Sequence, residues 1–168
     1  MWRRFTSSFF NKVDAKGRVS VPAPWRKALD ARGADGALIL VPGFRDRNCI
    51  EGYAPDTYES LAAAIAAMHP ADPNRKKLEY RLMGRAVPMQ VDENGRIVIG
   101  ADLRGAFGLE PEAVFVGVGD SFQIWSRAAY DLHVAPMMED DEDDGDPLAA
   151  LPWPGGAGGP GGAGGALQ

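Results

Sequence analysis

The sequence predicts an α+β protein built from two copies of one small β-rich unit. The stretch Val13–Leu29 returns 78 residues later as Val91–Phe107, with 7 of 17 positions identical, where chance would give about one or two. Both copies contain short runs in which apolar and polar residues alternate, as they do in half-buried strands. A third observation marks the C-terminal end of the folded part: from Glu139 on, the sequence becomes acidic and then rich in Gly and Pro.

Each copy begins with a tight turn. Asp14 and Gly17 in the first copy, and Asp92 and Gly95 in the second, have the chemistry of such a turn. An aspartate bonds nearby backbone N–H groups, and a glycine accepts a positive φ. An arginine follows each turn, then an alternating strand, and a short helix is expected after the strand. The repeat therefore predicts the order strand, turn, strand, helix in both halves.

The other elements follow from apolar runs and helix signals. Strands are expected from Phe9, at 37–42, 49–54, 86–91, 113–119 and 121–125, and helices near 24–32, at 55–69, 74–85 and 101–107, and after Ser126. The resulting segments are a first repeat at 8–54, connecting helices at 55–85, a second repeat at 86–129 and a tail at 139–168. The tail is acidic and then rich in Gly and Pro, and we expect it to be disordered, because like charges repel and glycine entropy opposes folding.

The charge is distributed unevenly along the chain. All 18 Lys and Arg lie at or before Arg127, while seven of the 23 acidic residues follow residue 138, so residues 1–138 carry +2 and the tail −7. Residues 1–32 alone carry +6, which is typical of a protein that presents a basic face to a polyanion. Cys49 is the single cysteine, and no signal peptide or long apolar run is present, which favours the cytosol.

The Asp-x-x-Gly-Arg turn, present twice and followed each time by a strand and a short arginine-bearing helix, resembles the MraZ family of bacterial transcription regulators. These proteins carry two SpoVT-AbrB-type DNA-binding repeats in one chain. The resemblance runs from about Phe9 to His133 and includes the segment 117–130, with Ile124-Trp125-Ser126 behind the second copy. One departure is Gly100, which stands where the family's second unit usually has proline and makes the start of that helix less certain.

The resemblance implies two AbrB-like swapped-hairpin units that form an intramolecular pseudo-two-fold barrel with peripheral helices. It also implies a ring-shaped homo-oligomer that binds double-stranded DNA at G-rich direct repeats, in the promoter of its own division and cell-wall operon. The expected function is transcription regulation, with repression as the expected sign. The expected location is the bacterial cytoplasm, at the nucleoid.

Arg18 and Arg96 are the leading candidates for DNA contact. A guanidinium pairs bidentately with guanine O6 and N7 in the major groove, for about 1–3 kcal/mol of discrimination. The alternative is that each arginine pairs with its own turn aspartate and holds the turn together. Lys16 at the first turn tip suits a phosphate, whereas Asn94 beside Glu93 takes its place in the second copy. The second half is therefore expected to bind DNA less strongly, or to serve assembly.

Other basic and aromatic residues are open to two interpretations. Lys12 is expected to contact DNA, whereas Arg26 and Arg104 are equally suited to DNA contact and to an ion pair or packed stem. The N-terminal aromatics Trp2, Phe5, Phe9 and Phe10 are interpreted mainly as core or interface packing. Solvated charge is the preferred interpretation for Arg45 and Arg47 in a loop and for the basic residues of the 74–85 helix.

The residues for catalysis or metal binding are missing. His69, His133 and Cys49 have no metal-ligand spacing, and no nucleophile motif or phosphate-binding loop occurs. We therefore predict no enzyme, no cofactor, no metal, no membrane and no small-molecule substrate. Three alternatives stay open: an AbrB-type antitoxin-like module that binds a protein, a non-specific nucleoid protein, and a small β-barrel enzyme that uses Asp14 and Asp92 as a carboxylate pair.

Overall fold

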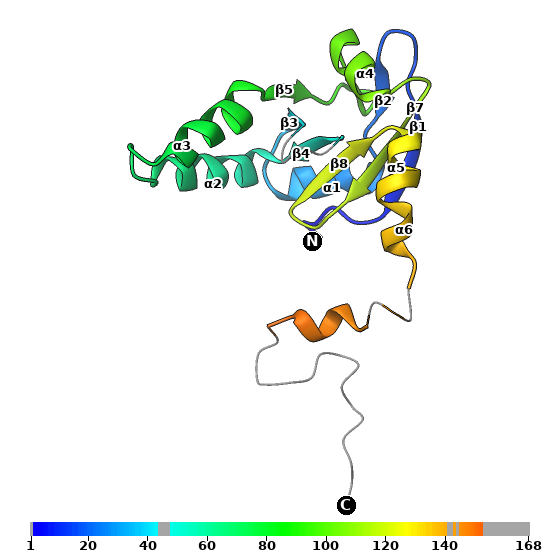
Figure 1. The fold of residues 1–168 in the computed structure, drawn as a ribbon. Coiled ribbons are helices and arrows are strands. Elements are labelled where there is room, and N and C mark those ends of the chain that lie inside the picture. The colour runs from blue at the N-terminus through cyan, green and yellow to red at the C-terminus, as the bar shows by residue number, and fades with distance from the viewer. Residues whose placement is uncertain (1, 44–47, 141–142, 144, 153–168) are drawn as a thin grey trace, which may run out of the picture.

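The computed structural model describes residues 2–43, 48–140, 143 and 145–152, and it shows an open antiparallel sheet, a separate two-stranded ribbon and flanking helices (Figure 1). The first half contains β1 (Ser8–Lys12), β2 (Arg18–Ser20), α1 (Ala23–Ala31), β3 (Ala37–Pro42) and β4 (Ile50–Tyr53). The second half contains β5 (Val87–Gln90), β6 (Arg96–Val98), α4 (Ala101–Phe107), β7 (Glu112–Gly117) and β8 (Ser121–Trp125). The predicted α+β class is confirmed.

The remaining helices lie between and after the halves. They are α2 (Pro55–Ala66), α3 (Pro73–Leu78), the π-helix η2 (Glu79–Gly84), α5 (Arg127–His133), α6 (Ala135–Met138) and the short 3-10 helix η4 (Pro147–Ala150). The single helix expected at 74–85 therefore changes from α to π geometry at Glu79. Arg45, Arg47 and the Gly-rich end of the predicted tail lie outside the described residues. None of the helices in the described ranges is long and apolar enough to cross a membrane.

The two halves exchange strands. The six-stranded sheet has the order β1-β7-β8-β4-β3-β5, so the first strand of each half pairs with the third strand of the other. The ribbon is formed in the same way, by β2 from the first half and β6 from the second. Barrel closure is not confirmed, because β1 and β5 remain edge strands of an open sheet. Pro88 on β5 suits such an edge, since proline cannot donate a ladder hydrogen bond.

The main core lies between the ribbon, α1 and one face of the sheet, and Trp25 is at its centre. Its indole Nε1 donates a 2.8 Å hydrogen bond to the Thr6 carbonyl, which satisfies the polar atom of a buried ring. Phe5 and Phe9 meet the indole edge-on, and Phe115 stacks on it. Core packing is therefore confirmed for Phe5 and Phe9, whereas Trp2 is 63% exposed.

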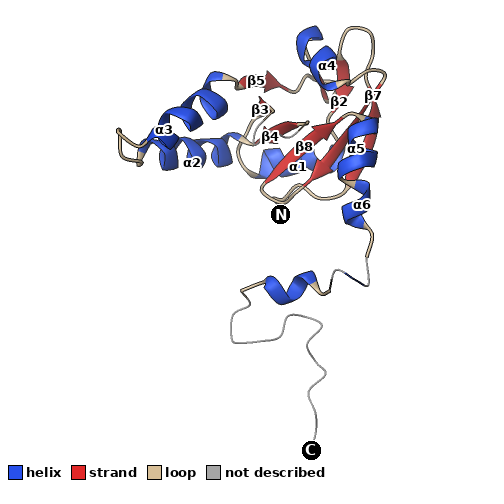
Figure 2. Ribbon diagram, in the orientation of Figure 1, coloured by secondary structure: helices blue, strands red, loops and turns tan. Residues whose placement is uncertain are grey.

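Helices pack on the opposite face of the sheet near both of its ends. Figure 2 shows α2 and α3 extending beyond the sheet on one side and α5 beside β7 and β8 on the other. One small core joins β3 and β4 to α2 and η2 through Val41, Tyr53, Ile65 and Leu82. Another joins β7 and β8 to α5 through Val114, Val116, Trp125, Ala129 and Tyr130. The Ser126 hydroxyl accepts the Ala129 N–H at 3.0 Å, which is the N-cap that the sequence predicts for α5.

Candidate nucleic-acid interface

The β2–β6 ribbon presents two arginines on its outward face. Arg18 lies opposite Val98 and Arg96 lies opposite Ser20, while the central pair Val19 and Ile97 points inward with 1% exposure each. Because side chains alternate along a strand, the outward face consists of Arg18, Ser20, Arg96 and Val98. The two arginines are diagonal neighbours across the ribbon, a relation that places their Cβ atoms roughly 7 Å apart.

The first turn positions Arg18 through one aspartate. Asp14 accepts the backbone N–H groups of Lys16 and Arg18 through Oδ1, at 3.0 and 2.9 Å. Its other oxygen, Oδ2, accepts the Arg18 Nε–H at 2.6 Å. The arginine side chain stays 40% exposed, and no hydrogen bond donated by its two Nη atoms is found in the described part of the chain. Asp14 thus aims the guanidinium outward while leaving its far edge open.

The second turn repeats this arrangement with a weaker ion pair. Asp92 accepts the N–H groups of Asn94 and Arg96 at 2.8 and 2.9 Å, but Arg96 Nε lies 3.9 Å from Oδ2 of Asp92. Among the described residues, this buried Nε has no hydrogen-bond partner. The alternative in which each arginine pairs with its own aspartate is thus present in both turns, and it is tighter in the first.

The turn geometry stabilises both carboxylates in their charged form. The pKa of Asp14 is lowered mainly by the backbone N–H of Arg18, with the arginine side chain and the Lys16 N–H adding to the effect. The pKa of Asp92 is lowered mainly by the N–H of Arg96, then by that of Asn94, and further by the charges of Arg96 and Arg18. Hydrogen bonds to the ionised form are the physical cause in both turns.

Arg104 braces the first turn from the helix of the other half. Its guanidinium donates to the Ile99 carbonyl, to the Ala15 carbonyl at 3.4 Å, and through Nε to Glu110 at 2.6 Å. The side chain is 12% exposed. A Cβ at Gly17, whose φ is +85°, would collide with this guanidinium, which explains the glycine. These contacts favour the ion-pair interpretation that the sequence left open for Arg104.

Arg26 lies over the second turn in the equivalent place. A Cβ at Gly95, where φ is +76°, would be 2.6 Å from Nη1 of Arg26. Arg26 is nevertheless exposed, and no ion pair of its guanidinium is found within the described ranges. Each short helix therefore packs its arginine on the turn of the other half, but only the Arg104 guanidinium is held by three acceptors.

A hollow beside the ribbon is lined by residues from both halves of the chain. Its volume is about 620 Å³, and it is lined by Lys12, Val13, Asp14, Arg18, Ser20, Arg96, Pro111 and Glu112. The structure thus brings Lys12 together with the two candidate arginines. Glu112 is paired with Arg127 at 3.3 Å. Lys16 is exposed at the neighbouring turn tip.

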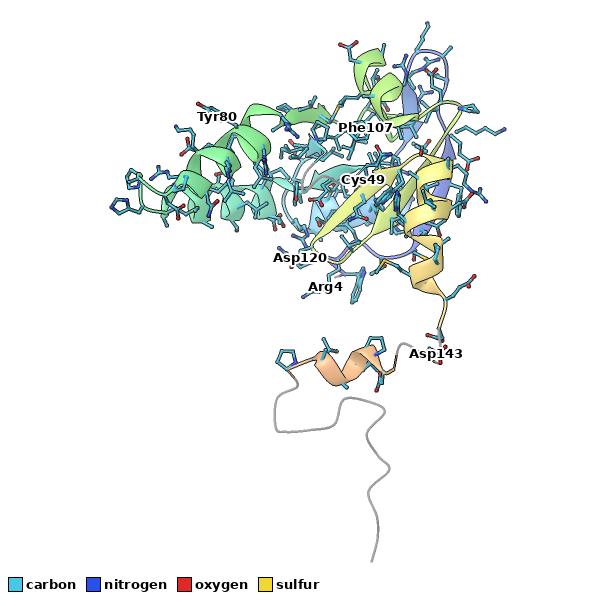
Figure 3. The ribbon with its side chains drawn as sticks, viewed as in Figure 1. Arg4, Cys49, Tyr80, Phe107, Asp120 and Asp143 are labelled. Carbon is cyan, nitrogen blue, oxygen red and sulfur yellow. The ribbon has the colours of Figure 1, made fainter. Side chains whose placement is uncertain are left out.

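The basic residues of the N-terminal arm are not part of this surface. Arg4 and Asp120 lie at the end of the molecule opposite the ribbon (Figure 3), where they form a 3.3 Å ion pair. The side chain of Arg32, at the end of α1, is 7% exposed and pairs with Asp56 and Asp120 at 3.2 and 3.1 Å. The +6 charge of residues 1–32 is therefore divided between two ends of the protein, a separation that linear sequence does not display.

Comparison with known proteins finds one family along most of the chain. The family described as "MraZ protein, putative antitoxin-like" matches residues 5–79 and 82–146. A relative from Ruegeria sp. (strain TM1040), named Transcriptional regulator MraZ, is 39% identical over 94% of this chain and 100% of its own length. The same name belongs to relatives from Ruegeria pomeroyi, 38% identical over the same shares, and from Rhodospirillum rubrum, 41% identical over 74% of this chain and 81% of the relative.

The chain belongs to the MraZ family.

In this MraZ-family chain the ribbon carries two further outward residues, Ser20 and Val98, that the sequence reasoning did not select. The signal was present, because period-two alternation from Arg18 and Arg96 places both of them on the same face. Glu112 in the hollow was also missed. Its position depends on the pairing of β1 with β7, in which Lys12 lies opposite Glu112, 100 residues later in the sequence. No local sequence pattern encodes that pairing.

Proposed function

We propose that this chain is a sequence-specific DNA-binding regulator of transcription whose β2–β6 ribbon enters the major groove. The observation that carries the proposal is the outward face of the ribbon, where Arg18 and Arg96 are diagonal neighbours on two paired strands. The major groove is wide enough for a two-stranded β-ribbon, and arginine is the commonest reader of guanine there. The name of the relatives, Transcriptional regulator MraZ, supports the same function.

The ion pairs prepare the arginines for base contact. Asp14 fixes Nε of Arg18 at 2.6 Å, so the side chain is ordered before DNA arrives and less rotamer entropy is lost on binding. The Nη edge then faces guanine O6 and N7. Arg96 is held more loosely, at 3.9 Å. We therefore assign the stronger base contact to Arg18 and the weaker one to Arg96.

Phosphate contacts are proposed for the exposed basic residues around the ribbon. Lys12 borders the hollow, Lys16 occupies the first turn tip and Arg26 covers the second turn. Each phosphate that such a residue neutralises contributes about 0.9 to the salt-dependence slope of the binding constant. Arg104, with its three acceptors, is proposed to position the first turn and not to touch DNA.

We further propose that the chain acts as a homo-oligomeric ring at the nucleoid in the bacterial cytoplasm. It binds G-rich direct repeats upstream of its own division and cell-wall operon and represses it. A second hollow of about 640 Å³ supports assembly, since it is lined by Val116, Val118, Trp125, Met137 and Met138, among others, and Met137 is 85% exposed. A head-to-tail contact between copies can close a ring, and linked subunits gain avidity on repeated sites.

Gel shift and sizing of variants test the proposal. The probe is DNA from directly upstream of the gene, compared with a scrambled duplex of the same composition. Arg18→Ala should weaken binding roughly 5- to 150-fold per site, the range that follows from about 1–3 kcal/mol per bidentate contact, while the oligomer persists. Arg75→Ala is the matched control, because Arg75 also pairs with a carboxylate four residues away, at 2.9 Å from Glu79, but on α3.

Unchanged affinity of Arg18→Ala would refute the assigned site. Equal affinity of the wild-type protein for promoter and scrambled DNA would refute sequence-specific regulation and favour non-specific nucleoid binding. A loss of binding in Arg75→Ala equal to that in Arg18→Ala would show that the ribbon is not the reading element.

A further inference from the structure

The outward face of the ribbon is symmetric in charge but not in its other two residues. The repeat relates Arg18 to Arg96 and Ser20 to Val98. Val98 is 53% exposed, although both apolar residues on the inward face are 1% exposed. The isopropyl group of Val98 is therefore exposed to solvent among the side chains that are proposed to contact base edges. At the equivalent position of the first repeat, Ser20 has a hydroxyl group.

The chemistry of the major groove limits what Val98 can recognise. A valine side chain neither donates nor accepts a hydrogen bond, so it discriminates only by apolar contact. The 5-methyl group of thymine is the apolar group that the bases present in that groove, whereas a serine hydroxyl bonds to the edges of several bases. The two sides of the ribbon thus differ in the base that each can select.

The register places Val98 beside one arginine in particular. Arg18 and Val98 are directly opposed on the two strands, an arrangement in which Cβ atoms are about 5 Å apart. That spacing is comparable with the roughly 3.4 Å rise between successive bases of a strand. When Arg18 meets a guanine, Val98 is within reach of the neighbouring base pair.

We propose that Val98 reads the 5-methyl group of a thymine next to the guanine bound by Arg18. This contact fixes the direction in which the ribbon reads its site. The inference rests on the proposed DNA-binding function and deepens it. A pseudo-two-fold ribbon with identical sides would accept its site in either orientation. The Val98–Ser20 difference, together with the stronger contact assigned to Arg18, removes that ambiguity, so that a nearly symmetric protein element recognises a non-palindromic sequence.

Removal of single methyl groups from DNA tests this contact. Full-length protein first selects its preferred duplex from a random-sequence library, and each thymine of that duplex is then replaced in turn by deoxyuridine. The same selection with Arg18→Ala identifies the guanine that Arg18 binds, because the preference for that guanine is lost. Replacing one thymine beside it by deoxyuridine should lower the affinity of the wild-type protein on the order of fourfold, the value expected for one buried methyl group. Val98→Ala should bind both duplexes equally. Ser20→Ala, the matched control on the related position, should keep the wild-type thymine-to-uracil ratio.

The outcomes separate this inference from the function on which it rests. Selection of a clear sequence with no uracil effect at any thymine leaves the regulator intact and overturns the role of Val98. A uracil effect that persists unchanged in Val98→Ala also overturns it, because another residue then reads the methyl. Failure of the library to yield any preferred sequence overturns the proposed function and this inference together. If Val98 served only the β-propensity of the strand, the wild-type protein would bind the thymine and uracil duplexes with equal affinity.

Discussion

A single carboxylate organises each reading turn. Asp14 closes the turn through the N–H groups of Lys16 and Arg18, and the same side chain binds the guanidinium of Arg18 at 2.6 Å. A carboxylate near phosphates would repel them if it were unpaired, and here the hydrogen bonds and the arginine neutralise it. Asp14 is thus a positioning residue: in the proposed function, its effect on DNA binding passes through the arginine.

The lowered pKa of Asp14 predicts how the turn responds to acid. Because the folded-state pKa lies below the ordinary value of about 3.9, the carboxylate stabilises the fold above that pH, and its contribution is lost as pH falls through the folded pKa. Asp14→Asn keeps an oxygen acceptor for the two N–H groups but loses the ion pair. The difference in Tm between wild type and this variant should be constant from pH 7 to about 5 and should shrink below about pH 4.

Thermal melts across that pH range provide the measurement. Asp30→Asn is the control, since Asp30 is an exposed acid on α1 whose side chain has no hydrogen bond within the described part of the chain. The interpretation is wrong if Asp14→Asn and wild type differ by the same Tm at pH 3 and at pH 7.

At the scale of elements, the ribbon is held by pieces that come from opposite halves. β2 and β6 pair over three residues each, and hydrogen bonds from Ile99 N to the Gly17 carbonyl at 2.8 Å and from Val21 N to the Gly95 carbonyl at 2.9 Å lengthen the pairing. An isolated two-stranded ribbon is marginal in water. Its inward residues and the contacts from the short helices therefore hold the ribbon in place, as the proposed base contacts require.

The two braces should differ in their effect on stability. Arg104→Ala removes a mostly buried guanidinium with three acceptors, and we expect a loss of about 1–3 kcal/mol in the free energy of unfolding, toward the low end because Glu110 is 49% exposed. Arg26→Ala removes an exposed side chain and should cost less than about 1 kcal/mol. Urea denaturation of both variants measures the difference. Equal losses would show that Arg104 has no special positioning role.

At the scale of the whole molecule, the reading ribbon and the second hollow are separate surfaces. The hollow lies along β7, β8, α5 and α6, and its rim includes Met137 and Met138, 85% and 54% exposed. Figure 1 shows α6 pointing away from the end of the molecule that carries β2 and α4. Assembly through this hollow would leave the ribbon free for DNA.

A charge placed in the hollow should therefore separate assembly from the fold. Met137→Glu should shift the protein to smaller species in light scattering, because burying an unpaired carboxylate in a subunit contact is costly. Its monomer should stay folded, since Met137 is exposed. Leu151→Glu, an exposed apolar residue outside the hollow, is the control. An unchanged mass for Met137→Glu would place the contact between copies elsewhere.

Sequence reasoning succeeded where the cause was local. The aspartate-glycine turns, the Ser126 cap and the end of α4 at Gly108, where φ is +64°, follow from residues within one turn of each other. Asp56 and Glu59 have the spacing of a capping box, but the structure has none there, because Ala54 is the N-cap of α2 and the Asp56 carboxylate accepts hydrogen bonds from Arg32.

What the sequence could not supply was long-range placement. The division of the basic residues between two ends depends on how the chain folds back, and so does the contact of each helix arginine with the turn of the other half. Val98 illustrates the limit. Its alternation with Ile97 predicts the face on which it lies, but its position opposite Arg18 comes from the pairing of strands from different halves.

The exchange of strands has a consequence for how the protein is made. β1 is synthesised first but pairs with β7, so its partner is incomplete until Gly117 has left the ribosome. Domains generally fold in order as they emerge, yet here the N-terminal half has no finished sheet of its own. β1 therefore has no sheet partner for most of the chain's synthesis, and the exchange between the halves is completed only after β7 has been made.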